Sequence, residues 1–303
     1  MRRSRLRAVL VLLAAMALLA AACGGDGDQA PPAAAGTVCG SYDKSAGDLL
    51  AEVCQSGEIR VSTDPAYPPQ SSLNKQTNDY EGFDIDVANE IGDRLGVAVE
   101  WETPSWDLII AGSWNGRWDM SVGSMTPTNR RQRVLFFTEP YYYTPAVVVV
   151  HADNTSTTDL SSDLDGKKIG VCSGCTYEFF LDKSLEITGF TFDFIIDNAE
   201  ITGYDTDTTA LQDLSLGDGT RLDAVITSVT TAQGYIDAGN PVKIVGEPVF
   251  YEPLAVSFDK SSELDPTTLV DSVATIVVDM HADGTLSQLS EEWYNGIDLS
   301  VQI

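Results

Sequence analysis

The strongest constraint on the fold is an alternation of strand-like and helix-like segments that begins near residue 58. A β-rich run at 59–63 precedes a stretch at 83–96 whose apolar residues recur at helical spacing and which ends at a glycine. A second strand at 97–101, a short helix at 106–112 and a third strand at 119–122 follow. This βαβ order predicts parallel strands with helices on both faces, and ligands bind such sheets at the carboxyl ends of the strands.

The same alternation restarts after a polar stretch that follows the apolar run AVVVV. We predict strands at 168–171, 222–226 and 242–245 and helices at 175–181, 208–216 and 229–238. A further strand (LAVSF) and two helices, 266–281 and 285–294, are too few for a third domain and are expected to return to the first lobe. The prediction is therefore one lobe from 56–147 plus 252–303 and another from 148–251, with crossings near 146–150 and 249–253.

The N-terminus is typical of an exported, anchored protein. Four arginines precede an unbroken apolar run that ends at Ala22, and Cys23 follows directly. The run of about 15 residues is short of the roughly 20 that span a bilayer, so we interpret 1–22 as a signal peptide; the alternative is a short anchor helix. The stretch Ala20-Ala21-Ala22-Cys23 resembles a lipobox, which would make Cys23 a lipidated N-terminus. We expect 23–55 to be a lipid-anchored tether containing a disulfide.

Four further cysteines remain. Outside the cytosol cysteines tend to pair, and proximity in the sequence favours Cys39 with Cys54 and Cys172 with Cys175. A metal site built from all four would need the two pairs to converge and has no nearby histidine. We expect disulfides.

Charge and motifs narrow the function. Of the 303 residues, 18 are Lys or Arg and 45 are Asp or Glu, and loss of the leader's four arginines would bring the net charge from −27 to −31. Such a surface repels nucleic acid, which excludes that partner. The sequence contains no P-loop, nucleophile elbow, zinc-protease motif or dinucleotide fingerprint. We therefore expect a binding protein rather than an enzyme, without cofactor or metal.

Polar and aromatic residues follow the three strands of the first lobe. Arginine grips a carboxylate through two parallel hydrogen bonds, an aromatic ring can cover a ligand's aliphatic part, and an aspartate can receive a cationic group. These side chains predict a site for a small zwitterion in a cleft with locally concentrated arginine. The alternative is that Trp106 packs in the core and the arginines pair with surface acids. The residues concerned are Asp64, Tyr67, Trp106, Ser124, Thr126, Arg130, Arg131 and Arg133.

Two other acids receive a different interpretation. Asp205-Thr206-Asp207 begins like a calcium loop but lacks the glycine and the distal glutamate of that motif. We interpret both aspartates as solvated loop acids.

Several ordered motifs resemble the bacterial extracellular solute-binding family 3, the binding proteins of polar amino-acid ABC transporters. They are GFDIDVANEIGDRLGV, WDLII, SMTPTNRRQRVLFFTEPYYY and DGTLSQLSEEWYNG, within a resemblance from about Glu58 to Ile297. The resemblance implies an α/β, type II periplasmic-binding-protein-like clamshell with two hinge strands.

The resemblance also implies roles for individual residues. Arg131, rather than Arg130, would bind the ligand carboxylate together with the amide and hydroxyl of Thr126, and Thr176 would be a further donor from the second lobe. Ser124 would offer its carbonyl to the ammonium. Asp64, Tyr67 and Trp106 match positions that line the site.

One departure concerns the ammonium. Family members that bind α-amino acids usually carry an aspartate where this chain has Ser228, and a hydroxyl cannot make a charge-assisted bond. Either Asp64 takes that role or the ligand is not an ordinary α-amino acid.

These observations predict an extracytoplasmic, lipid-anchored protein, expected to be a monomer, that captures an amino-acid-like zwitterion or small carboxylate for an ABC permease. Two alternatives stay open. One is a dehydratase-like enzyme on the same fold, although no catalytic carboxylate is identifiable in its cleft. The other is a ligand-sensing surface module that acts on a separate signalling chain.

Overall fold

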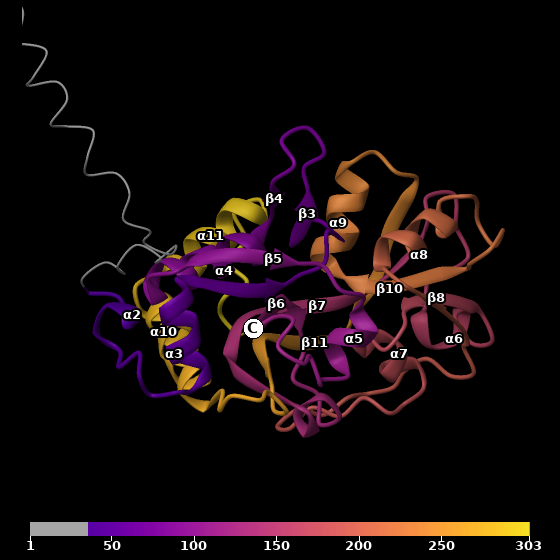
Figure 1. Cartoon of the computed structure of the whole chain (residues 1–303). Coiled ribbons are helices and arrows are strands. Elements are labelled where there is room, and N and C mark those ends of the chain that lie inside the picture. The colour runs from indigo at the N-terminus through magenta and orange to yellow at the C-terminus, as the bar shows by residue number, and fades with distance from the viewer. Residues whose placement is uncertain (1–35, 303) are drawn as a thin grey trace, which may run out of the picture. The chain divides into compact units, whose positions relative to one another are not determined.

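A single mixed β-sheet forms the centre of the molecule (Figure 1), as seen in a computed structural model that describes residues 36–302. Its spatial order is β5-β1-β6-β11-β7-β10-β8-β9. The strands are β1 (Glu58–Ser62), β5 (Ala98–Glu102), β6 (Met120–Met125), β7 (Leu135–His151), β8 (Lys168–Cys172), β9 (Glu200–Tyr204), β10 (Ala224–Ser228) and β11 (Val242–Asp259). The parallel triplets β5-β1-β6 and β10-β8-β9 belong to the two predicted lobes, as the α/β pattern requires.

The two lobes are joined by β7 and β11, which are long enough to run through both. They pair antiparallel from Leu135 with Asp259 to His151 with Val242. Between the pairs Val245–Val148 and Phe250–Ala146 the register shifts, because β11 advances by more residues than β7. Such a bulge bends a strand locally, and it lies where the two crossings were predicted.

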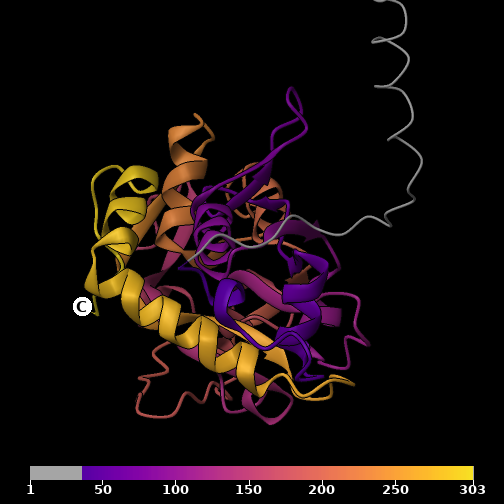
Figure 2. The same cartoon turned by 60° about the vertical axis from the view of Figure 1, so that its left-hand side comes forward.

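Lobe 1 buries a large apolar core and a smaller one around Trp114 and Trp118 under its helices. These are α3 (Leu49–Ser56), α4 (Phe83–Leu95), α10 (Thr267–Ala282) and α11 (Thr285–Trp293), with the shorter α2 (Val38–Ser41), α5 (Trp106–Ile110) and the 3-10 turn η1 (Arg131–Arg133). The long helix α10 packs against α3, α4 and α11 (Figure 2), so the C-terminal elements do return to the first lobe. Gly96 ends α4 in the left-handed conformation at φ 86°, as its stop signal predicted.

Lobe 2 is covered on both faces of its sheet. Alternate residues of β7 enter different cores: Val148 and Val150 face one cluster, and Val147 and Val149 face the other. The run AVVVV is apolar throughout because neither face of this strand meets water. The helices that provide the cover are α6 (Leu160–Asp163), α7 (Thr176–Leu181), α8 (Asp207–Leu214) and α9 (Val229–Asp237).

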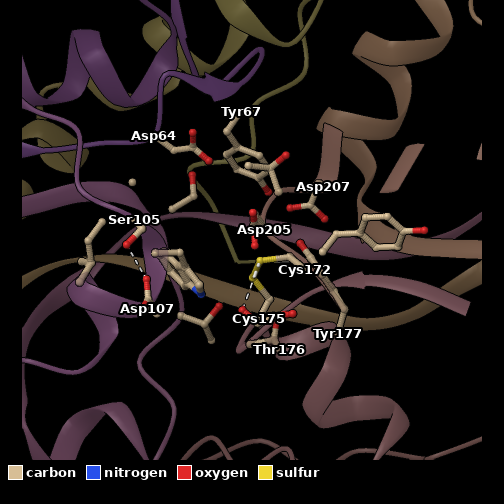
Figure 3. A pocket seen from close by; sticks show the side chains of 18 of the residues that line it. Asp64, Tyr67, Ser105, Asp107, Cys172, Cys175, Thr176, Tyr177, Asp205 and Asp207 are labelled. Carbon is tan, nitrogen blue, oxygen red and sulfur yellow. Dashed lines mark hydrogen bonds between the residues drawn. A yellow bond between two sulfur atoms is a disulfide. The ribbon is translucent and has the colours of Figure 1, made fainter. Parts of the chain in front are cut away.

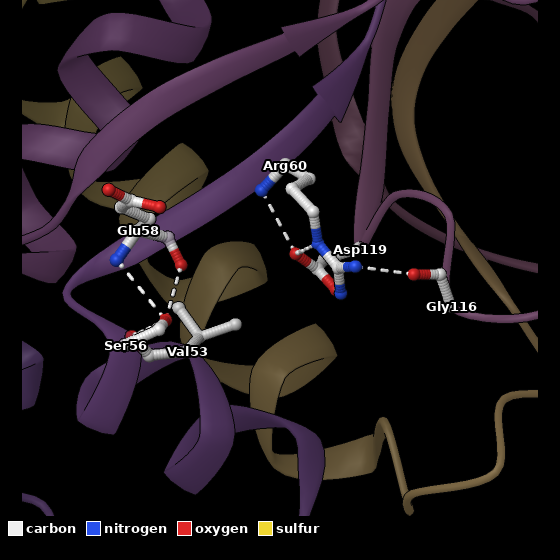
Figure 4. Close-up of polar contacts among 6 residues, drawn as sticks. All are labelled: Val53, Ser56, Glu58, Arg60, Gly116 and Asp119. Carbon is white, nitrogen blue, oxygen red and sulfur yellow. Dashed lines mark hydrogen bonds and ion pairs between the residues drawn. The ribbon is translucent and has the colours of Figure 1, made fainter.

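A contact within lobe 1 ties the start of β6 to β1. The Asp119 carboxylate, which is almost fully buried, accepts hydrogen bonds from the Arg60 backbone amide (2.9 Å) and from its Nε (3.1 Å), and its second oxygen lies 2.6 Å from Nη2 (Figure 4). This two-pronged pair is the geometry that arginine offers a carboxylate. It holds in place the strand that leads to the predicted site residues after β6.

The predicted tether is too long. We assigned 23–55 to it, but α2 and nearly all of α3 lie within that range, and Leu50 and Val53 are buried in the lobe 1 core. The apolar residues of LLAEVC recur on one helical face, which is the pattern of a helix packed on a core. We overlooked this pattern because a polar stretch precedes it. The leader 1–22, the lipidation site Cys23 and the first part of the tether lie outside the described residues.

Both predicted cysteine pairs are disulfide-bonded, Cys39 with Cys54 and Cys172 with Cys175. The first lies in the lobe 1 core. No helix within 36–302 is long and apolar enough to cross a membrane.

Serine at both Cys39 and Cys54 should lower the free energy of unfolding by about 3 kcal/mol, because this bond closes a loop of 15 residues and so restricts the unfolded chain. Urea denaturation under oxidising conditions measures the loss. The disulfide between Cys172 and Cys175 closes a loop of only three residues, so serine at both positions should lower the free energy of unfolding by about half as much. Equal losses for the two double variants would contradict this ordering.

Candidate functional site

A cavity of about 310 Å³ lies between the lobes. Seven of the eight predicted ligand-binding residues line it: Asp64, Tyr67, Trp106, Ser124, Thr126, Arg131 and Thr176. In lobe 1 they lie in the segments that follow β1 and at or after the end of β6, and at the start of α5; in lobe 2, Thr176 is the first residue of α7. Figure 3 shows how residues of the two lobes enclose the space.

Arg131 spans the gap between the lobes. It is 3% exposed, and its Nη1 donates to the carbonyl of Thr126 while Nη2 donates to the carbonyl of Gly174 in lobe 2, both at 2.9 Å. Its Nε is buried and has no acceptor within 36–302. Burial lowers its pKa to about 10, opposed by the attraction of Glu252, so the side chain stays charged at neutral pH. Neighbouring Arg130 is exposed and lies over the ring of Phe179.

Trp106 combines the two interpretations that the sequence left open. The Arg131 guanidinium carbon lies 4.9 Å from the centre of its ring, within cation–π range. The same ring lines the cavity and packs on the small core formed around Trp114 and Trp118. Trp106 is therefore both a core residue and a wall of the site.

Ser124 is held by lobe 1. Its hydroxyl donates to Asp84 Oδ2 (2.7 Å) and its amide to the hydroxyl of Tyr141 (3.0 Å), which in turn donates to Asp84 Oδ1 (2.8 Å). These bonds hold Ser124 at a φ of 52°, a conformation uncommon for a residue with a side chain. Burial raises the pKa of Asp84 to about 7. That the Ser124 carbonyl meets a ligand ammonium stays a prediction.

Glu252 was missed by the sequence analysis. It lies on the hinge strand β11, is 2% exposed, and its Oε2 accepts from the hydroxyls of Thr126 (2.7 Å) and Thr176 (2.6 Å), one from each lobe. In this structure the Thr126 hydroxyl donates to Glu252, because a buried carboxylate needs donors of its own; that Thr126 meets a ligand carboxylate stays a prediction. The only signal in the sequence was an acid within the otherwise apolar segment VFYEPLAVSF.

Ser228 does not reach the cavity. It is fully buried at the N-cap of α9, where its hydroxyl accepts from the amide of Thr231 at 3.2 Å. Across the lobes it also accepts from the hydroxyl of Tyr67 (3.1 Å) and from Nε2 of Gln70 (3.3 Å). The residue at the predicted ammonium position thus bonds one lobe to the other and is not among the residues that line the cavity.

Asp207 corrects our interpretation of the DTD segment. Thr206 caps α8, and Asp207 is the first residue of that helix; it is 5% exposed and lines the cavity. Its Oδ1 is buried and has no hydrogen-bond partner among the described residues. Burial, with repulsion from Asp64 and Glu252, raises its pKa to about 7. Of the two aspartates in this segment, Asp205 is solvent-exposed as we expected, whereas Asp207 is buried.

The charge of the cavity is the reverse of the expected one. Arg131 is the only Arg or Lys among its described lining residues, because Arg130 and Arg133 point to solvent. Five acids line it: Asp64, Asp107, Asp205, Asp207 and Glu252. The cleft is acidic around one buried guanidinium.

The CSGC loop shapes the wall beside Arg131. Its disulfide lines the cavity, and the carbonyl that Arg131 contacts belongs to Gly174, inside the bridged loop. Gly174 has a φ of 72°, and a Cβ there would lie 3.0 Å from the side chain of Ile110 in lobe 1. A glycine is required at this position by both conformation and space.

Fold and cavity together are those of a two-lobed binding protein, with the cavity enclosed between the lobes. The chain belongs to the bacterial extracellular solute-binding proteins, family 3, whose family model matches residues 59–296.

Three relatives illustrate the match. The L-cystine-binding protein TcyJ of Escherichia coli is 28% identical over 87% of this chain and 92% of its own length. The L-cystine-binding protein TcyA of Bacillus subtilis is 29% identical over 97% of this chain and 99% of its own. Among solved structures, an ancestral amino acid-binding protein described as a precursor of cyclohexadienyl dehydratase is 30% identical, with a TM-score of 0.69 over 81% of this chain and 99% of that chain.

Proposed function

We propose that this protein binds an amino acid between its lobes outside the cytoplasm and delivers it to the permease of an ABC transporter. Arg131 carries the proposal: it is a buried guanidinium, stacked beside Trp106 and contacted by both lobes, with an N–H that has no acceptor within the described chain. A ligand carboxylate would complete the hydrogen bonding of this arginine. The names of the relatives, which bind amino acids, support the same ligand class.

Closure of the lobes is part of the proposed binding cycle. Direct bonds already link them: Arg131 to Gly174, Tyr67 to Ser228, and Thr208 Oγ1 to the carbonyl of Ala66 at 2.9 Å. A ligand that contacts both walls favours this closed state by its differential contacts. Attachment to the membrane through a lipidated Cys23, after removal of residues 1–22, would hold the protein close to its permease.

The test is a ligand screen. Exported full-length protein, stripped of bound ligand by unfolding and refolding, is titrated with amino acids, betaines and small acids while its melting temperature is followed. We expect at least one amino acid to raise the melting temperature by mass action, with calorimetry giving the stoichiometry. The proposal fails if no amino acid binds.

A dehydratase is the second candidate, and one observation favours it. Asp207, a buried cavity acid whose pKa is close to 7, has the protonation behaviour of a general acid, and one structural neighbour is described as a dehydratase precursor. Turnover of a cyclic carboxylic acid such as prephenate, followed by absorbance, would decide for this candidate. Absence of turnover together with amino-acid binding would decide against it.

A further inference from the structure

The acidic cavity poses a charge problem that an ordinary zwitterion leaves unsolved. Arg131 supplies a single positive charge for Glu252 and a ligand carboxylate together, and one ligand ammonium neutralises one further acid. Asp64 and Asp207 lie on opposite lobes, and both line the cavity (Figure 3). A second ionised carboxylate would then remain enclosed without a counter-charge, which is costly in a site shielded from water.

Asp207 is a buried lining acid whose charge no cationic side chain among the described residues compensates. It is 5% exposed, its Oδ1 is unpartnered within 36–302, and no ion pair engages it there. The acids Asp64 and Glu252 repel its charge. Ser228, expected at the ammonium position, is committed to α9 and to the interlobe bonds. An ammonium bound in the cavity therefore finds its charged partner at the start of α8.

Asp64 offers the second carboxylate. It follows β1 in lobe 1, it is half-buried, and its Oδ1 accepts from the amide of Ala66 at 2.8 Å. That bond fixes the side chain in a turn and leaves lone pairs of the carboxylate for another donor.

From these contacts we infer that Asp207 holds the ligand's α-ammonium, that Asp64 receives a second cationic group, and that the site selects amino acids of net positive charge. This inference rests on the proposed function. A ligand with a guanidinium or ammonium side chain fits it. A neutral ligand with two ammonium groups, such as cystine, also carries two carboxylates, and the described lining provides only Arg131 for them.

Matched ligands test the charge selection. Calorimetry on the stripped, full-length protein compares L-arginine with L-citrulline, which has nearly the same shape but no side-chain charge, and L-lysine with L-norleucine. We expect L-arginine or L-lysine to bind at least about 10-fold more tightly than its neutral counterpart, because only the charged side chain can make a charge-assisted hydrogen bond to Asp64. Equal affinities within both pairs would overturn the inference.

Matched variants test the assignment of Asp207. Asp207→Asn keeps the shape and removes the charge, and we expect it to weaken binding of the preferred amino acid about 100-fold or more. The unliganded variant should melt no lower than the parent, because it loses a buried charge without a partner; a residue important only for folding would do the opposite. Asp193→Asn, at an exposed acid of lobe 2 outside the cavity lining, should change affinity less than about 3-fold. Unchanged affinity in Asp207→Asn would overturn the assignment.

The failures are distinguishable. If a neutral amino acid binds as tightly as its cationic counterpart and Arg131→Ala abolishes that binding, the charge inference is wrong and the proposed function stands. If no amino acid of any charge binds, the proposed function itself is wrong.

Discussion

Arg131→Ala should abolish detectable amino-acid binding. Truncating one partner of a buried, hydrogen-bonded charge pair costs about 2–5 kcal/mol, which lowers affinity by roughly 30- to 5,000-fold. Arg131 also joins the lobes through the carbonyls of Thr126 and Gly174, so its loss weakens closure in addition to direct contact. Calorimetry with the best amino acid from the screen measures the change.

Arg130→Ala is the matched control for this experiment. Arg130 is adjacent in sequence but exposed, stacked on the ring of Phe179 outside the cavity lining. We expect its removal to leave affinity within about 3-fold, as for other exposed charges. Far-ultraviolet circular dichroism verifies that both variants are folded. If a folded Arg131→Ala variant bound with parental affinity, the site would have to be placed elsewhere.

The second large effect is a loss of stability with rising pH in the ligand-free protein. Burial raises the pKa of both Asp84 and Asp207 to about 7, against an ordinary value of 3.8. Between these values the folded protein keeps a proton that the unfolded chain has lost, so stability falls as pH rises and levels off above about 7. Between pH 5 and 8 each group should reduce the free energy of unfolding by about 3 kcal/mol.

Urea denaturation at pH 5, 6, 7 and 8 tests this prediction. Asp207→Asn should remove roughly half of the slope, and Asp84, held by Ser124 and Tyr141, should account for most of the rest. Asp64 and Glu252, which face Asp207 and whose pKa burial also raises, act in the same direction. A parental slope in Asp207→Asn would show that Asp207 does not hold its proton in the folded state.

Saturating ligand should change this pH dependence. A cation beside Asp207 stabilises the ionised form of its carboxyl group, so ligand binding near pH 6 should release a proton. The other titratable groups around Asp207 keep their protonation states at this pH; they are Tyr67, Tyr177 and Arg131. The release appears as a binding heat that varies with the ionisation enthalpy of the buffer. A heat independent of the buffer would place the ammonium away from Asp207.

Much of the fold could be predicted because it is encoded locally. Helical spacing before Gly96 predicted α4, and the apolar run AVVVV lies in the strand β7, where the structure buries it on both faces. Short elements without a periodic signal were missed, among them β9 and the three-stranded sheet of β2 (Ala66–Tyr67), β3 (Ser71–Leu73) and β4 (Tyr80–Glu81). Strands of two or three residues are too short to show alternation, and β9 (EITGY) has no apolar run that marks it, so only their partners define them.

The sequence by itself determined that this chain forms two α/β lobes with two hinge crossings and which cysteines pair. It also placed Arg131 and Trp106 after strands of the first lobe. Only the tertiary structure decided the charge of the cleft. Asp207 is enclosed while Asp205 two residues earlier is exposed, and Glu252 takes the hydroxyls of Thr126 and Thr176. The physical reason is that the free energy of an ionised carboxylate depends on its burial and on partners from distant segments of the chain. The neighbouring residues in the sequence specify neither of these.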